Sequence, residues 1–176
     1  AIAKLPSSAD PLDAALEGLK KADIDLADVS LFSHGTTVAT NALIERNLPH
    51  TAMICSEGFR DVIEIGNSTK QDLWDAYRDN PPAYIRRRDR LTINERTTSS
   101  GEVEIEIDPD EARALVNKLR KREYRAIAIC FMNAFANAAN EKALKAILQE
   151  ELPDVAISTS AEVLPEIFEH DRFSTT

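Results

Sequence analysis

The feature that most constrains the fold is an alternation of short apolar runs with longer amphipathic segments. The runs have the length of buried strands, and apolar residues recurring every three or four positions predict helices between them. Strands separated by helices favour parallel pairing, because the chain must cross the sheet to reach the next strand. We therefore expect a mixed, largely parallel α/β sheet with flanking helices. The expected strands are Val29–Phe32, Thr51–Cys55, Ala126–Phe131 and Val155–Ser158, and the expected helices are Pro11–Ala22, Thr37–Arg46, Asp110–Glu123 and Asn140–Glu151.

Two segments depart from this alternation. Leu91–Arg96 and Glu102–Ile107 alternate apolar with polar residues on either side of a Ser- and Gly-containing turn, which predicts an inserted antiparallel hairpin. Residues 66–90 mix loop formers, aromatic residues and two adjacent prolines, and we interpret them as an excursion with a helical turn around Leu73–Tyr77. We divide the chain accordingly into a first α/β part, residues 1–66, the excursion and hairpin, residues 67–107, and a second α/β part, residues 108–176.

Composition narrows the classes of function. With 176 residues and 43% hydrophobic content, the chain can bury a core. A formal net charge of -9 argues against nucleic-acid binding, which needs clustered Lys and Arg. Cys55 and Cys130 lie in apolar runs, so we expect buried, reduced thiols and a cytosolic protein. The spacing of the two cysteines and three histidines predicts no metal site, and no apolar run is long enough to span a bilayer.

One basic run interrupts the acidic chain. Arg86, Arg87 and Arg88 are adjacent, and Arg90 follows after Asp89. We interpret this run as a salt-bridged surface or a partner contact, with phosphate binding as the less favoured alternative.

The first candidate site is the turn His34-Gly35-Thr36-Thr37, between an expected strand and the next helix. Gly35 lets the backbone turn sharply, and Thr36 or Thr37 can cap the helix. The N–H groups of a helix start attract a phosphate or an oxyanion, and ligands of open α/β sheets bind at strand ends. Asn41, one helical turn later, can fix the loop. Such turns also carry Gly and Thr for capping alone, and a lone His is often structural, so both interpretations remain open.

Two further sets of polar residues lie near expected strand ends. Glu57, Arg60 and Asp61 follow the strand Thr51–Cys55, where Arg60 can clamp a carboxylate or phosphate with its two-pronged guanidinium. A turn held by local ion pairs explains this set equally well. Glu162 and Glu166, on either side of Leu164-Pro165, are weaker candidates, because acidic residues at a helix start explain them too.

Several ordered motifs together resemble the hydantoinase A / 5-oxoprolinase family. They are HGTTVATNALIERN, SEGFRDVIEIGN, the basic stretch before INER, the helix start DPDEA, and STSAEVLPEIFEHDRFSTT. The resemblance implies an ATP-dependent enzyme, because family members hydrolyse cyclic amides such as hydantoins, 5-oxoproline and caprolactam, or carboxylate ketones such as acetophenone. It also implies part of a nucleotide domain related to the actin, sugar-kinase and heat-shock ATPases.

If the family chemistry applies, ATP phosphorylates an amide or enolate oxygen of a small-molecule substrate, a reaction that depends on positioning and charge neutralisation. For that chemistry we predict catalytic roles for His34, Arg60 and Asp61. We predict cofactor binding by Gly35, Thr36, Thr37 and Asn41.

The resemblance further predicts that this chain is an internal fragment of a longer subunit. The family's strand and acidic Gly-Gly-Thr phosphate loop do not precede Ala1, and Ser174-Thr175-Thr176 lie inside a motif that normally continues. We therefore expect ATP and Mg²⁺ to be held mainly by residues outside this chain, and a companion hydantoinase B-type subunit or domain as partner. Hydrolase, carboxylase and non-catalytic assembly module remain alternatives.

Overall fold

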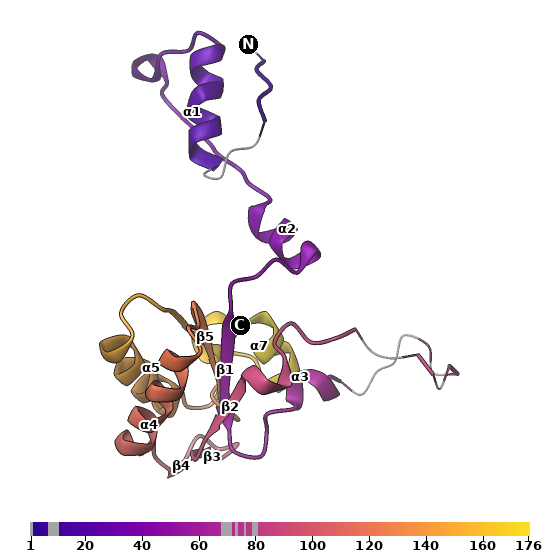
Figure 1. Ribbon diagram of the computed structural model, residues 1–176, viewed down its shortest axis with the longest axis vertical. Helices are drawn as coiled ribbons and strands as arrows, with labels where there is room; N and C mark the ends of the chain where they lie inside the picture. The colour runs from indigo at the N-terminus through magenta and orange to yellow at the C-terminus, as the bar shows by residue number, and fades with distance from the viewer. Residues whose placement is uncertain (1, 7–10, 68–71, 73, 76, 79–80) are drawn as a thin grey trace. The chain divides into compact units, whose positions relative to one another are not determined.

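The computed structural model describes residues 2–6, 11–67, 72, 74–75, 77–78 and 81–176. The chain divides into two compact units, Ala1–Asn47 and Leu48–Thr176 (Figure 1). The three-part division expected from the sequence stays a prediction. Within the described ranges, no helix has both the length and the apolar character needed to cross a membrane.

The first unit contains the helices α1 (Pro11–Lys21) and α2 (Val38–Glu45) and the 3-10 turn η1 (Leu26–Asp28). Both expected helices are confirmed. The strand expected at Val29–Phe32 is wrong: the N–H of Val29 closes the η1 turn on the carbonyl of Leu26, and no segment within residues 2–6 and 11–47 pairs with it. A strand needs a hydrogen-bonded neighbour, which an apolar run alone does not supply.

The second unit is built on four parallel strands in the order β2-β1-β5-β6. These are β1 (Thr51–Ser56), β2 (Arg90–Ile93), β5 (Ala126–Cys130) and β6 (Ala156–Thr159). The strands expected at Thr51–Cys55 and Ala126–Phe131 are confirmed, and that expected at Val155–Ser158 is confirmed with a shift of one residue. Met53 pairs with Ala128 and Cys55 with Cys130, so both strands present side chains to the same faces in register.

Each face of this sheet has its own core. Alternate residues of β1 and β5 pack against α4 (Pro109–Lys121) and α5 (Ala139–Glu151) on one face. The other residues, including both cysteines, pack with Phe173 of α7 (Glu169–Thr175) and with α3 (Val62–Ile65) (Figure 1). Both cysteines are buried and free, as expected. Burial of two faces explains the nearly continuous apolar character of these strands.

Helix α4 begins where its sequence predicts. The Asp108 side chain accepts a hydrogen bond of 2.9 Å from the N–H of Asp110, and Pro109 occupies the first helical position. A missing N–H costs nothing at that position, because the first turn of a helix has no internal partner for it. The helix expected at Asn140–Glu151 is confirmed as α5.

The expected hairpin needs correction. Leu91–Arg96 does not pair with Glu102–Ile107 as a whole, because β2 takes Arg90–Ile93 into the parallel sheet beside β1. The antiparallel pair is the shorter β3 (Arg96–Thr97) with β4 (Val103–Ile105). The helical turn expected around Leu73–Tyr77 includes Leu73 and Ala76, which lie outside the described residues. Before β2 the chain forms the short turn η2 (Arg87–Asp89), and after β6 it forms α6 (Ser160–Val163).

Candidate functional site

The topology of the second unit points to one place on the sheet. From β1 the chain crosses to β2 on one side, whereas from β5 it crosses to β6 on the other. The crossovers therefore diverge between the carboxyl ends of β1 and β5, where open α/β sheets form their ligand crevice. The loop Glu57–Asp61 follows β1 there, and residues 131–138 follow β5. These loops are the candidate site of the second unit.

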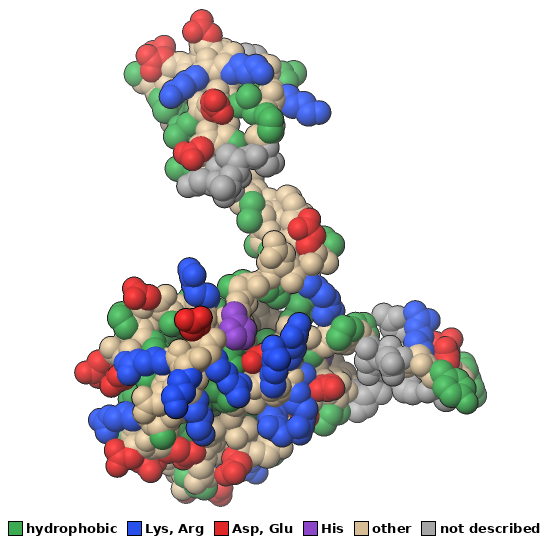
Figure 2. Space-filling view, in the orientation of Figure 1, with side chains coloured by type: hydrophobic (Ala, Val, Ile, Leu, Met, Phe, Trp, Pro, Cys, Tyr) green, Lys and Arg blue, Asp and Glu red, His purple; other side chains and the backbone are tan. Residues whose placement is uncertain are grey.

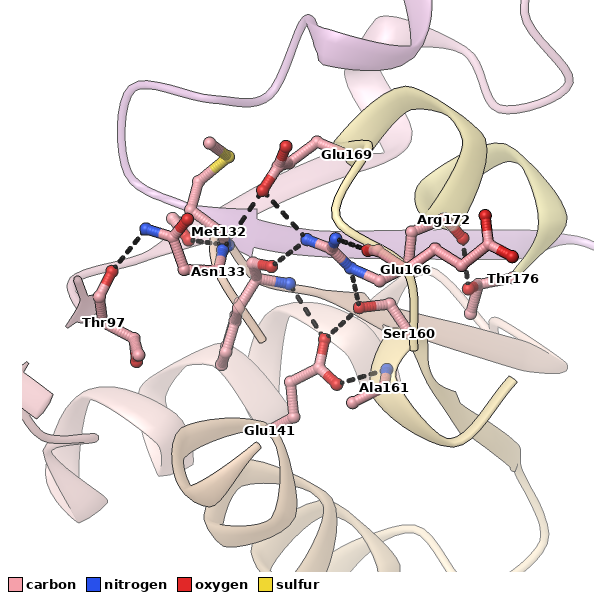
Figure 3. A network of polar contacts seen from close by, with 12 residues as sticks. Thr97, Met132, Asn133, Glu141, Ser160, Ala161, Glu166, Glu169, Arg172 and Thr176 are labelled. Carbon is pink, nitrogen blue, oxygen red and sulfur yellow. Dashed lines mark hydrogen bonds and ion pairs between the residues drawn. The ribbon is translucent and has the colours of Figure 1, made fainter. Parts of the chain in front are cut away.

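A buried network supports the end of β5 (Figure 3). The Glu141 carboxylate accepts hydrogen bonds from the Phe131 N–H at 3.0 Å, the Ser160 hydroxyl at 2.6 Å and the Ala161 N–H at 2.9 Å. Arg172 donates to the Ser160 oxygen at 3.1 Å and to the Phe131 carbonyl at 3.0 Å. Ser160 thus joins the carboxylate of α5 to the guanidinium of α7.

Arg172 is the centre of this network. It is 0% exposed, and it also donates to the Glu166 carbonyl at 2.6 Å and to the Glu169 carboxylate at 3.3 Å. The rings of Phe135 and Phe173 lie 5.6 and 5.3 Å from its guanidinium carbon. Glu169 in turn accepts from the Asn133 N–H at 3.3 Å. A buried guanidinium needs this many partners to offset the loss of water.

A second buried cluster holds the ends of β1 and β2. The Ser56 hydroxyl donates to the Glu95 carboxylate and accepts from the Met132 N–H at 2.9 Å. Asn140 donates to the other Glu95 oxygen at 2.8 Å and to the Ile105 carbonyl at 2.9 Å. The Glu95 carboxylate therefore ties the end of β1 to α5, and Asn140 extends this connection to β4.

Burial shapes the acidity of both carboxyl groups. Desolvation raises the pKa of Glu95, against the lowering effect of the hydrogen bonds from Ser56 and Asn140. Desolvation likewise raises the pKa of Glu141, which the bond from Ser160, two backbone N–H groups and the charge of Arg172 oppose. Among the described residues, each hydrogen-bond partner of these two carboxylates is a donor, an arrangement that suits the ionised form. With its donors and acceptors already paired, this network serves as a scaffold for the loops above it.

The charged side chains of the loop after β1 differ in whether they have ion-pair partners. Asp61 accepts three hydrogen bonds from Arg87, the shortest 2.9 Å, and one from Arg90 at 3.2 Å. The hydrogen bond from Arg87 holds the pKa of the Asp61 carboxyl below its usual value. Arg90 is almost completely buried and also pairs with Glu64 at 2.6 Å. Asp61 is thus held by ion pairs, but its partners lie 26 and 29 positions later in the chain and not within the turn.

Arg60 and Glu57 differ from Asp61. In the described part of the chain, neither side chain has a hydrogen-bond or ion-pair partner. Glu57 is exposed and Arg60 half-buried, and the loop turns at Gly58, whose φ of 88° is one that residues with a side chain rarely adopt. Arg60 therefore keeps a guanidinium without a partner among the described residues, whereas the carboxylate of its neighbour Asp61 is already paired with Arg87 and Arg90.

The His34-Gly35-Thr36-Thr37 turn belongs to the first unit and is exposed throughout. The Thr36 hydroxyl caps α2 by accepting from the Val38 N–H at 3.2 Å. Thr37 occupies the N-cap position without a side-chain bond to the helix, but its hydroxyl lies 3.5 Å from the Asn41 amide nitrogen. Nothing lies within 4 Å of where a Cβ on Gly35 would be. The structure therefore places Gly35, Thr36, Thr37 and Asn41 around one helix start, with the His34 backbone beside them.

The weaker candidates have structural partners. Glu162 pairs with Lys145, and their hydrogen bond lowers the pKa of the Glu162 carboxyl. Glu166 is exposed, and its carbonyl accepts from Arg172. Within the described ranges, no group of three or more His, Cys, Asp or Glu side chains could hold a metal ion.

The sequence interpretation missed the buried network. Glu141 stands three and seven positions before Leu144 and Leu148, so a charged residue occupies the apolar face of α5. An acidic residue at such a position signals a buried polar contact. Arg172 lies directly before the buried Phe173 and gives a similar, weaker signal. Ser56 and Glu95 carry no comparable mark.

Comparison with known proteins decides the family. A model of the hydantoinase/oxoprolinase N-terminal region matches residues 1–152. The chain belongs to the hydantoinase/oxoprolinase family. It is 34% identical over 153 residues to caprolactamase subunit alpha of Pseudomonas jessenii, covering 86% of this chain and 22% of that protein. It is 30% identical over 166 residues to the acetophenone carboxylase gamma subunit of Aromatoleum aromaticum, covering 85% of this chain and 22% of that subunit.

The fold comparison agrees. The crystal structure of the ATP-dependent caprolactamase from Pseudomonas jessenii superposes with a TM-score of 0.81 at 30% identity, over 96% of this chain and 26% of that one. The caprolactamase of this crystal structure is named as ATP-dependent, and the names of the caprolactamase and acetophenone carboxylase relatives describe subunits of larger complexes. This chain spans about a quarter of the length of the relatives it matches.

Proposed function

We propose that this chain is part of the ATP-dependent subunit of a cyclic-amide hydrolase that activates its substrate by phosphorylation. The observation that carries the proposal is the similarity to the ATP-dependent caprolactamase, in sequence and in fold. The parallel sheet with helices on both faces is the arrangement expected for part of an actin-like ATPase fold, in which a nucleotide binds at strand ends. The substrate class is a small cyclic amide.

The turn at α2 fits a contribution to phosphate binding. The open space beside Gly35 lets a ligand approach the backbone, and the hydroxyls of Thr36 and Thr37 lie at the start of an eight-residue helix. Asn41 would hold the Thr37 side chain in place through its 3.5 Å contact. When bound, ATP with Mg²⁺ supplies the phosphoryl group that turns an amide oxygen into a better leaving group, and residues outside this chain would hold most of both.

His34, Arg60 and Asp61 are proposed to act on the substrate side. The exposed His34 imidazole would donate a hydrogen bond to a substrate oxygen that gains negative charge. Arg60 is suited to bind a carboxylate or phosphate, because its guanidinium has no partner among the described residues. Asp61 would act indirectly, since its pairs with Arg87 and Arg90 fix the loop that carries Arg60.

A ketone carboxylase is the second candidate, favoured by the 30% identity to the acetophenone carboxylase gamma subunit. The residue roles would be the same, with an enolate oxygen in place of the amide oxygen. A non-catalytic assembly module is the remaining alternative, in which the companion hydantoinase B-type subunit binds the excursion at residues 66–90.

ATP turnover by the full-length subunit with its companion subunit tests the proposal. Hydantoin, 5-oxoproline, caprolactam and acetophenone are compared, each with and without bicarbonate. We expect a cyclic amide to stimulate ATP hydrolysis without bicarbonate. Stimulation only by acetophenone with bicarbonate would favour the carboxylase, and stimulation by none of the substrates would favour the assembly module.

Calorimetry on the 176-residue chain tests where the nucleotide is held. We expect no Mg-ATP binding in the micromolar range, because most phosphate and metal contacts would come from outside the chain. Micromolar binding would show that the nucleotide site lies within these residues.

A further inference from the structure

A cluster of charged side chains lies at the amino edge of the second unit's sheet, opposite the candidate site. Asp89, which directly precedes β2, is buried and accepts a hydrogen bond of 2.7 Å from the Tyr124 hydroxyl. Three basic side chains lie within 4 Å of its carboxylate: Arg88 at 3.5 Å, His50 at 3.7 Å and Arg122 at 3.8 Å. One negative charge thus faces two permanent positive charges and a titratable imidazole.

Contacts within the cluster fix these side chains in place. The rings of His50 and Tyr124 lie 4.3 Å apart, and Arg122 donates to the Tyr124 hydroxyl at 3.2 Å and to the Arg88 carbonyl at 2.6 Å. Burial opposes ionisation of Asp89, but the hydrogen bond from Tyr124 and the charge of Arg88 outweigh it and lower the pKa of its carboxyl. The anion at the centre of the cluster is therefore present at neutral pH.

The outer surface of the cluster has an excess of positive charge. The side chains of His50, Arg88 and Arg122 are 45%, 68% and 46% exposed. Arg86 and Arg125 are exposed as well, and within the described ranges neither side chain has a hydrogen-bond or ion-pair partner. Figure 2 shows Lys and Arg side chains gathered around a histidine on the visible face of this unit. We call His50, Arg86, Arg88, Arg122 and Arg125 the basic edge.

An apolar cavity adjoins the basic edge at Tyr124. Its volume is about 190 Å³, and its walls are mainly apolar side chains from the end of α4, from β5 and from the segment after α5, with Arg120 and the exposed Glu123 at its rim. Arg120 lies at this cavity and is held by two hydrogen bonds of 2.7 Å to Glu151. The cavity has room for one aliphatic side chain. The apolar lining residues are Leu119, Tyr124, Ile127, Leu152 and Val155.

We infer that the basic edge with its adjoining cavity is a docking site for an acidic protein segment carrying one aliphatic anchor residue. Charge complementarity supports this occupant, because a chain of net charge -9 otherwise repels acidic partners and collects positive charge at this edge. A buried apolar anchor within a charged rim is the usual anatomy of a protein interface. The relatives are named as subunits, so the companion subunit is the partner to which we assign this segment. The inference concerns assembly and is independent of the reaction proposed above.

Fluorescence anisotropy with labelled probes tests the inference on the 176-residue chain. The first probe is a twelve-residue peptide of Glu and Gly with one central Leu, and the second has Ser in place of that Leu. We expect the Leu peptide to bind at low salt, at least about threefold more tightly than the Ser peptide, and binding to weaken as salt rises. Phosphatidylserine vesicles and a twelve-nucleotide RNA are the competing probes.

Charge reversal identifies the surface. The Arg125 side chain has no hydrogen-bond or ion-pair partner among the residues that the structure describes. Arg125→Glu and Arg122→Glu should each weaken binding of the Leu peptide at least about tenfold. The matched control is Arg113→Glu on the exposed face of α4, which should leave binding unchanged. Among the described residues, the Arg113 side chain pairs with Asp110 alone. Circular dichroism verifies the fold of each variant. Equal losses in the Arg113→Glu control, no binding at 1 mM peptide, or tighter binding of RNA or vesicles would each overturn the inference.

Discussion

Polar side chains at the α2 turn and at the carboxyl edge of the second unit's sheet are used in opposite ways. At the turn, His34 is exposed, and Thr36 makes one capping bond. At the sheet edge, Arg172 is 0% exposed and Glu141 accepts three hydrogen bonds. Groups already paired inside the protein have little left to offer a ligand, whereas open groups can bind one without first breaking a native contact.

This difference distinguishes residues that hold the loops in place from residues that are proposed to contact a ligand. The network around Arg172 fixes the loop after β5, and Asp61 fixes the loop after β1, so both belong to the support. Arg60 stands between the two classes, since it lies on a supported loop but keeps its guanidinium unpaired among the described residues. The following variants test this separation, beginning with the largest expected effect.

Arg172→Met should cause the largest loss of stability. The change removes bonds to Ser160, Glu169 and two carbonyls and leaves the buried Glu141 carboxylate without its compensating charge. Breaking a buried charge network in this way costs about 3–5 kcal/mol. Urea unfolding measures the free energy of unfolding.

The matched control is Arg113→Met, because Arg113 is exposed and, within the part of the chain that the structure describes, pairs with Asp110 alone. It should change the free energy of unfolding by less than about 0.5 kcal/mol. If the two variants lost equal stability, the network at β5 would not be the support described above.

His34→Ala should change activity strongly and stability little, the reverse of what is expected for Arg172→Met. An exposed side chain on a turn contributes little packing, so the free energy of unfolding should change by less than about 0.5 kcal/mol. Activity of the full-length enzyme should fall about 10²-fold or more if His34 donates to a developing oxyanion. Steady-state ATP turnover and thermal melting are measured on one preparation. A destabilised but fully active variant would remove His34 from the proposed chemistry and favour Arg60.

Much of this fold could be predicted from the sequence, because helix starts and buried strands depend on residues that are neighbours in the chain. The Asp108-Pro109 helix start and the apolar runs of β1 and β5 follow from capping and burial, which a short window of sequence contains. The strand prediction for Val29–Phe32 was wrong because the same apolar character occurs in a segment without a strand partner. The hairpin prediction for Leu91–Arg96 was wrong because β2 pairs with β1, far earlier in the chain, although its alternation of apolar and polar residues also fits a hairpin.

The site was less predictable for the same reason. The bond between Ser56 and Glu95 joins residues 39 positions apart, and that between Arg172 and Phe131 joins residues 41 apart. No short pattern encodes such pairs. The α2 turn could be located because Gly35 and the two threonines act on their own neighbours. Which of Arg60 and Asp61 keeps a free charge depends on Arg87 and Arg90, whose position only the fold supplies.

Alkaline pH should weaken the second unit through its buried thiols. Burial raises the pKa of Cys55 from 9.0 to about 12. Because this pKa is higher in the folded than in the unfolded protein, the contribution of the Cys55 thiol to the free energy of unfolding is complete below pH 9. That contribution is lost as pH rises from 9 toward 12. At pH 10 the free energy of unfolding should be lower by about 1.4 kcal/mol. The difference in unfolding free energy between wild type and Cys55→Ala, measured at pH 8 and pH 10, isolates this group from other titrations. An unchanged difference would show that the Cys55 thiol is not buried in solution.

The smallest effect should come from Asp61→Asn. Asp61 pairs with Arg87 and Arg90, but its side chain is 37% exposed, and solvent screens such pairs strongly. We expect Tm to fall by less than about 4 °C at pH 7. Because the hydrogen bond from Arg87 lowers the pKa of Asp61, its contribution is present above the ordinary carboxyl pKa and disappears as pH falls through the lowered value. The difference from wild type should therefore vanish in acid.

If Asp61 only positions the Arg60 loop, Asp61→Asn should also lower activity less than Arg60→Gln does. An activity loss from Asp61→Asn larger than that from Arg60→Gln would instead place Asp61 in direct contact with the substrate.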